Sequence, residues 1–175
     1  MDWLSLPGLA LLVAANTAPV VAASLAGQRA AWPLDCGLVL GDGRRLLGGH
    51  KTWRGLAAAT LAAGAVALAF GLAFRVGALA GASTIAGDAL SSFVKRRLDR
   101  APGAWIPGLD QLPESVLPLA VSWHALGLDA PRFTLTVAVF TVLDLLASRL
   151  FGSSRRSRRP PPDRRDAAAP DRTGH

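Results

Sequence analysis

Long apolar runs alternate with short polar segments along most of this chain. Five runs carry almost no charge and cover residues 3–28, 56–74, 76–94, 112–128 and 133–148. A helix that crosses the hydrocarbon core of a bilayer needs about 20 mostly apolar residues, with a range of roughly 17–25. The first three runs reach that length, and the last two lie at or just below its lower end. Because the runs are solidly apolar rather than alternating, they favour helices over a β-barrel. The pattern predicts an all-α integral membrane protein with five transmembrane helices.

Basic residues gather in the segments that five crossings place on one side of the membrane. The loops 29–54 and 95–111 and the tail from residue 149 carry five, four and eight Lys or Arg residues, whereas only Arg75 and Arg132 fall on the other side. Cytoplasmic loops are enriched in Lys and Arg. We therefore predict that the N-terminus lies outside and that the C-terminus and both basic loops are cytoplasmic. Omitting the fourth run would place the Arg-rich tail outside, which supports keeping it.

Composition divides the chain into a membrane domain, residues 1–151, and a basic tail, residues 152–175. Hydrophobic residues make up 51% of the sequence, and the net charge is +7. The tail is rich in Arg, Pro and Asp, so we expect it to be disordered and to rest on anionic lipid headgroups. A tail that binds nucleic acid or a protein partner is the less favoured alternative. The single cysteine, Cys36, excludes an internal disulfide bond.

The first basic loop combines glycines with cations immediately before a predicted helix. Five glycines, Gly41, Gly43, Gly48, Gly49 and Gly55, fall within fifteen residues beside these cations. Glycine lets backbone N–H groups approach an anion closely, and a helix N-terminus favours negative charge. Lys51 and Arg54 add positive charge there, and Thr52 adds a hydroxyl. The loop is a candidate phosphate-binding loop, although it lacks the Walker spacing. A flexible loop whose charges only orient the helices explains the composition equally well.

An acidic residue, Asp88, interrupts the third apolar run. It precedes Lys95 by seven residues, so the helical rise places it about 10 Å below the cytoplasmic end. Ionisable groups at such depth are costly and are normally paired, exposed to a wet cavity or functional. Ser91, Ser92 and Lys95 share its helical face, and Asp110 follows in the next loop. Because Mg²⁺ takes one or two carboxylates together with water and phosphate oxygens, Asp88 and Asp110 are candidate metal ligands. A structural ion pair of Asp88 with a Lys or Arg is the alternative.

Three further polar residues receive weaker predictions. Asp144, near the end of the fifth run, is expected to pair with an Arg of a loop. His50 lies in the candidate phosphate-binding loop, where no partner can be named for it. His124 is expected to form a hydrogen bond between helices.

Several short motifs follow one another between about residues 16 and 150. They are Pro33-Leu34-Asp35, Gly41-Asp42-Gly43-Arg44-Arg45, Leu47-Gly48, Lys51-Thr52-Trp53-Arg54-Gly55, Gly87-Asp88, Ser92-Phe93-Val94-Lys95-Arg96-Arg97 and Leu109-Asp110-Gln111. In this order and spacing they resemble the CDP-archaeol synthase family, part of the wider group of membrane CTP:phosphatidate cytidylyltransferases. The resemblance implies a five-helix membrane fold with its active-site loops on the cytoplasmic side.

The resemblance also implies a Mg²⁺-dependent nucleotidyltransferase of phospholipid biosynthesis. Such an enzyme transfers CMP from CTP to a membrane lipid phosphate and releases pyrophosphate. The implied catalytic residues are Asp88, Asp110 and Lys95, with Asp88 and Asp110 holding the metal. The implied nucleotide- and phosphate-binding residues are Lys51, Thr52, Arg54, Ser92 and Arg96, with Asp35 and Asp42 ordering the loop.

The lipid acceptor stays open at this stage. The family usually has an acidic residue three positions after the Asp of the Leu-Asp-Gln motif, but this chain has Pro113 there and Glu114 next. An archaeol-type phosphate, a phosphatidate that would give a CDP-diacylglycerol, and a polyprenyl phosphate are the acceptors considered. We expect CTP, a lipid phosphate and the bilayer as partners, and no nucleic acid, with a homodimer left open. The alternative function is that of a non-catalytic small membrane protein or a transporter-like helical bundle.

Overall fold

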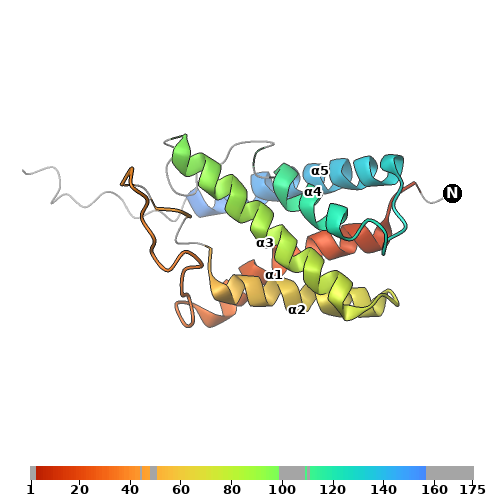
Figure 1. Ribbon diagram of the computed structural model, residues 1–175, viewed down its shortest axis with the longest axis horizontal. Helices are drawn as coiled ribbons and strands as arrows, with labels where there is room; N and C mark the ends of the chain where they lie inside the picture. The colour runs from red at the N-terminus through yellow and green to blue at the C-terminus, as the bar shows by residue number, and fades with distance from the viewer. Residues whose placement is uncertain (1–2, 44, 48–50, 99–108, 110, 157–175) are drawn as a thin grey trace, which may run out of the picture.

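The computed structural model describes residues 3–43, 45–47, 51–98, 109 and 111–156, with side chains up to residue 149. Its helices are α1 (Leu6–Ala26), α2 (Trp53–Ala69), α3 (Phe74–Arg97), α4 (Gln111–Val121) and α5 (Ala130–Arg156). Other regular structure in these residues is limited to two isolated β-bridges. The predicted all-α class is therefore confirmed. The loop between α1 and α2 lies at the end of the bundle where α3 ends (Figure 1).

Apolar side chains cover the outside of the bundle as well as its interior. Leu25, Leu61 and Leu79, on three different helices, are 83%, 61% and 58% exposed. So much exposed apolar surface is typical of helices that face lipid. Among the described residues, the segments Leu6–Ala26 and Ala130–Arg149 are long and apolar enough to cross a membrane, and α2 is apolar but has only 17 residues. Five crossings and their orientation stay predictions.

The fourth helix is shorter than the apolar run suggested. We expected a helix over 112–128, but α4 has 11 residues and ends at Val121. At 1.5 Å per residue it is about 16 Å long, roughly half the thickness of a bilayer core. The chain continues as turns up to Gly127, where Leu128 N–H donates to Trp123 O at 3.0 Å and Gly127 has a φ of 58°. This is a Schellman-type closure, which glycine adopts without strain.

The fifth helix is longer than the apolar run 133–148 that predicted it: α5 continues to Arg156. Residues 152–156, which we assigned to the disordered tail, are therefore helical. Ser and Arg do not break a helix, and the first proline beyond α5 is Pro160. The remainder of the predicted tail, 157–175, lies outside the described residues.

Glycines allow α3 to pack directly on the backbones of both its neighbours. A Cβ added at Gly77 or Gly81 would lie 2.1 Å from Ala63 O or 2.4 Å from Ala59 O of α2. On the α4 side, a Cβ at Gly87 would lie 2.3 Å from Pro113 O. Such contacts are typical of small residues at membrane helix interfaces. The packing at Gly87 brings Asp88, the next residue, close to the first turn of α4.

We predict that Gly81→Ala destabilises the protein by about 1–3 kcal/mol, because the new methyl group overpacks a backbone contact that has no room for it. The measurement is the free energy of unfolding of the purified protein in detergent micelles. Gly41→Ala is the matched control: nothing lies within 4 Å of its added Cβ, so its effect should stay within about 0.5 kcal/mol. Equal effects of the two substitutions would contradict the close approach of α2 and α3.

Candidate functional site

The loop between α1 and α2, residues 27–52, is fastened to the start of α2 by backbone hydrogen bonds. Leu34 N–H donates to Lys51 O at 2.7 Å, and Trp53 N–H donates to Trp32 O at 3.1 Å. Thr52 is the N-cap of α2, and its Oγ1 accepts a hydrogen bond from Gly55 N–H at 3.1 Å. A capping hydroxyl satisfies one of the free N–H groups of a helix start. The hydroxyl of Thr52, which we predicted to bind phosphate, therefore caps α2 in this structure.

Lys51 connects this loop to α3. Its Nζ donates to the Oδ2 of Asp88, which is 37 residues away in sequence. The two side chains are 19% and 29% exposed, so the pair is mostly buried but still reached by solvent. Two of the predicted site residues are thus brought together. The contact is also the ion pair considered as the structural alternative for Asp88, and it explains how a carboxylate is accommodated in an apolar helix.

Asp35 holds the middle of the loop together. Its side chain is fully buried, and its carboxylate accepts hydrogen bonds from Arg45 Nη2 at 2.6 Å, Gly37 N–H at 3.0 Å and Leu47 N–H at 3.1 Å. Burial by itself raises the pKa of Asp35, but the Arg45 guanidinium and the two N–H groups outweigh it and hold that pKa below its usual value. The carboxylate is therefore kept ionised while buried.

Arg97, at the end of α3, binds the same loop. Its Nη1 donates to Asp42, and its Nη2 donates to Arg45 O at 3.3 Å. The guanidinium also lies 5.3 Å from the centre of the Phe93 ring, one helical turn earlier. We did not include Arg97 among the site residues. The spacing of Phe93 and Arg97, four residues apart on one helix, was the signal that could have identified it.

Arg54 contacts the backbone that follows α1. Its Nη1 donates to Gly27 O at 2.9 Å and to Arg29 O at 2.5 Å. A guanidinium suits this position, because the last carbonyls of a helix carry partial negative charge. These contacts hold the loop entrance against α2, and none of them joins Arg54 to Lys51 or Asp88.

Polar side chains of α3 are buried beyond Asp88. Ser91 is fully buried, and its Oγ donates to the backbone carbonyl of Asp88 at 2.9 Å rather than to the carboxylate. Ser92 and Lys95, both predicted site residues, are 7% and 8% exposed. Arg96 is half-buried. The α3 part of the predicted site therefore lies mostly inside the protein.

The first turn of α4 contributes buried polar residues beside α3. Gln111 and Glu114 are 1% and 8% exposed. The close approach of Gly87 to the backbone of α4 includes the nitrogen of Glu114. Gln111 Nε2 donates to Asp144 Oδ2 at 3.1 Å, so this described contact of Asp144 comes from a glutamine and not from the loop arginine that we expected. Glu114 was noted only as the nearest acid to the expected position, and packing places its backbone nitrogen against Gly87, the residue before Asp88.

Part of the predicted site cannot be placed. Asp110, the second predicted metal ligand, lies outside the described residues, as do Arg44, Gly48, Gly49 and His50. Among the described residues, no group of three or more His, Cys, Asp or Glu side chains could hold a metal ion. The proposed pair of carboxylates thus stays a prediction.

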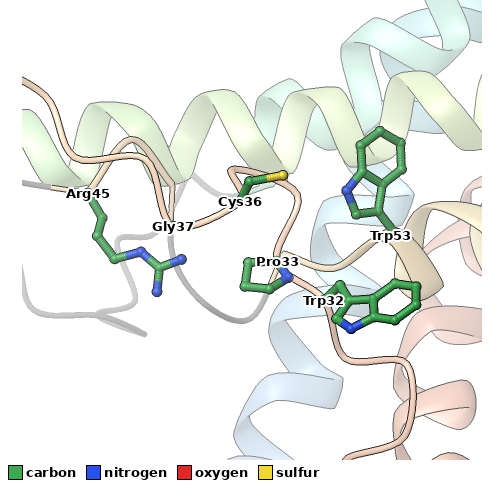
Figure 2. A pocket seen from close by; sticks show the side chains of 6 residues that line it. All are labelled: Trp32, Pro33, Cys36, Gly37, Arg45 and Trp53. Atoms are coloured by element: carbon green, nitrogen blue, oxygen red, sulfur yellow. The ribbon is translucent and has the colours of Figure 1, made fainter.

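A pocket of about 530 Å³ lies on the outer side of the loop. Figure 2 shows the residues that line it, which are Trp32, Pro33, Cys36, Gly37, Arg45 and Trp53. Trp53, the first residue of α2, is 51% exposed, and Trp32, whose backbone carbonyl accepts from Trp53 N–H, is 74% exposed. Tryptophan in this position is typical of a membrane–water interface. Neither Lys51 nor Asp88 lines the pocket, so we separate it from the site around their ion pair.

Comparisons with known proteins point to one family. A family model described as CDP-archaeol synthase matches residues 3–151. The chain is 38% identical over 148 residues to the CDP-archaeol synthase of Methanopyrus kandleri, covering 80% of this chain and 84% of that protein. It is 44% identical over 144 residues to that of Aeropyrum pernix, covering 78% of each. A solved structure reported as an intramembrane enzyme for archaeal membrane lipids biosynthesis is similar with a TM-score of 0.62 at 37% identity, over 79% of this chain and 90% of that one.

We predict that acidification releases the Asp35 contacts. The pKa of Asp35 in the folded protein lies below its ordinary value, so the unfolded chain takes up the proton first as the pH falls. The stabilisation is complete above the unfolded-state pKa and is lost as the pH falls through the folded-state pKa. Asp35→Asn should lower the free energy of unfolding at pH 7 by about 1–3 kcal/mol and reduce the further fall of that free energy as the pH drops below the ordinary pKa of an aspartate.

The control for this measurement is Asp129→Asn, because Asp129 is exposed and its ion pair with Arg132 has an N–O distance of 3.8 Å. An exposed pair contributes little, and Asn can accept the hydrogen bond that Asp129 Oδ1 accepts from Arg132 N–H at 2.8 Å at the start of α5, so the stability and its pH dependence should remain close to wild type. An Asp35→Asn protein with wild-type stability at pH 7 would show that the carboxylate does not hold the loop.

Proposed function

The chain belongs to the CDP-archaeol synthase family, and on that premise we propose that it transfers CMP from CTP to a lipid phosphate of archaeol type and releases pyrophosphate. Membership confirms the resemblance drawn from the order of the motifs. A CTP-dependent cytidylyl transfer in a membrane follows from the family, and the acceptor and the leaving group are our proposal. The observation that carries the proposal is the contact between Lys51 and Asp88, because this contact brings two of the sequence motifs together in space.

The reaction that we propose is an in-line displacement at phosphorus. An oxygen of the lipid phosphate attacks the α-phosphorus of CTP and forms the new P–O bond. The bond from that phosphorus to the oxygen bridging to the β-phosphate breaks, and pyrophosphate leaves with the electron pair. Such a reaction needs positioning and neutralisation of charge more than covalent catalysis. Because the attacking phosphate is already ionised, no strong general base is required.

Cations of the loop and of α3 would perform the neutralisation. Lys51 lies at the junction of the two elements, and Lys95 and Arg96 follow Asp88 on α3. An ammonium group supplies a compact charge, whereas the guanidinium of Arg96 can bind two phosphate oxygens at once. Asp35 and Arg97 would act indirectly, since their contacts fix the loop that carries Lys51.

Asp88 has the chemistry that a metal site requires. Its carboxylate already accepts a cationic group, Lys51 Nζ, and remains 29% exposed. Mg²⁺ takes few protein carboxylates and several water or phosphate oxygens. We propose that Asp88, together with Asp110 as inferred from the sequence, holds Mg²⁺. When bound, the ion would neutralise phosphate oxygens and stabilise the leaving pyrophosphate.

The acceptor and the sidedness belong to the same proposal. The names of the relatives support an archaeol-type acceptor. Pro113, at a position where the family usually has an acid, keeps phosphatidate as the second candidate. We propose that the loop between α1 and α2 and the end of α3 face the cytoplasm, where CTP is found. Their common position at one end of the bundle supports this arrangement (Figure 1).

We predict that Asp88→Asn lowers the transfer of label from CTP labelled at the α-phosphate to lipid by about 100-fold or more, because the site loses a charge needed at the reacting phosphates. The assay uses the purified protein in vesicles with Mg²⁺ and, in parallel, archaeol-type phosphate or diacyl phosphatidate. Label at the γ-phosphate should appear only in pyrophosphate.

Asp129→Asn is the control, since Asp129 is an exposed acid that pairs with Arg132, and its transfer rate should equal that of wild type. A fully active Asp88→Asn protein would remove Asp88 from the reaction. Wild-type protein that labels neither lipid would contradict the proposed function, and labelling of phosphatidate alone would reverse the choice of acceptor.

A further inference from the structure

Lys51 occupies one carboxylate oxygen of Asp88, the residue proposed to bind the metal ion. Its Nζ contacts the Oδ2 atom of the carboxylate directly, and a divalent cation bound to the same carboxylate would be brought close to the ammonium group. Like charges at such separations repel strongly where the surroundings are only partly exposed to solvent. The ammonium group and a divalent cation would therefore compete for Asp88.

We propose that Lys51 is an exchangeable counter-ion that keeps metal away from Asp88 until nucleotide is present. This inference rests on the proposed function, in which Asp88 binds metal and Lys51 binds phosphate. When metal and nucleotide arrive together, Lys51 transfers its contact from the carboxylate to a phosphate, and the metal takes its place at Asp88. Metal alone binds weakly, because Lys51 would then lose its partner and remain beside a divalent cation.

The exchange leaves no shielded charge without a partner. Asp88 gives up one cation and gains another, while Lys51 gives up a carboxylate and gains a phosphate. Removing one member of a shielded ion pair is strongly unfavourable when nothing replaces it. The coupled exchange avoids that cost, whereas separate binding of metal incurs it. The ion pair thereby favours simultaneous binding of metal and nucleotide.

The structure also indicates which partner moves. Asp88 belongs to α3 and follows Gly87, whose backbone is packed against α4. Lys51 precedes the N-cap of α2 and has a flexible stem of four carbons. Its side chain can turn toward solvent while its backbone carbonyl keeps the hydrogen bond from Leu34 N–H. Lys51 is thus a binding residue whose ammonium group changes partner, whereas Asp88 keeps its position.

The test measures the binding of Mn²⁺, without nucleotide, to the purified full-length protein in detergent micelles. Electron paramagnetic resonance reports the free ion. Lys51→Met removes the ammonium but keeps a long side chain, so the protein should bind Mn²⁺ at least about tenfold more tightly than wild type. Lys51→Arg keeps the positive charge and should bind Mn²⁺ as weakly as wild type.

Two controls isolate the contact at Asp88. Arg29→Met removes a positive charge from the same loop at an exposed residue, so it reports the general effect of charge and should change Mn²⁺ affinity much less. Adding Asp88→Asn to Lys51→Met should abolish the tighter binding. Lys51→Gln replaces Lys51→Met if thermal unfolding shows that the Met variant does not fold.

A folded Lys51→Met or Lys51→Gln protein that binds Mn²⁺ no more tightly than Arg29→Met would overturn the inference. So would tighter binding that survives Asp88→Asn. Neither result depends on catalysis. If the Mn²⁺ results are as expected but wild-type protein transfers no label from CTP, the proposed function fails and the counter-ion stands. If wild-type protein transfers label but the Lys51 variants bind Mn²⁺ as weakly as wild type, the proposed function stands and the counter-ion inference fails.

Discussion

The ion pair between Lys51 and Asp88 joins the polar loop of this protein to its apolar helices. Asp88 lies in a helix packed on both sides by neighbours, where an ionised carboxylate needs a compensating charge. Lys51 supplies that charge from a loop that has no helix of its own. The same contact brings a cation and an anion to the place where phosphates and a metal would meet. Stability and the proposed chemistry therefore depend on one pair of side chains.

The surrounding contacts keep this pair in position. Glycines let α3 lie against the backbones of α2 and α4, so Asp88 is held between rigid elements. On the loop side, Asp35 binds Arg45 and two backbone N–H groups, and Arg97 binds Asp42. Buried and partly buried charges of this kind are retained when each has a partner. The loop is consequently held by ion pairs and hydrogen bonds in addition to the packing of Leu34 against the apolar core.

The sequence predicted the helices better than the contacts between them. Apolar runs identify helices in lipid, and the depth of Asp88 alone indicated that it needed a partner or a function. The predicted end of α4 was wrong, because the sequence stays apolar up to Leu128 whereas the backbone leaves the α-helix after Val121 and continues as turns. The partner of Asp88 lies 37 residues away. Such pairing depends on how α2 and α3 pack, which spacing along the chain does not encode. The contacts of Arg54 and Arg97 were missed for the same reason.

The most direct test is a double-mutant cycle on the ion pair itself. The free energies of unfolding are measured for wild type, Lys51→Met, Asp88→Asn and the double variant under one set of conditions. If the two side chains interact as described, the effects are not additive, and the coupling free energy is about 1 kcal/mol or more. Effects that add to within about 0.5 kcal/mol would show that Lys51 and Asp88 act independently, and the account built on their contact would be wrong.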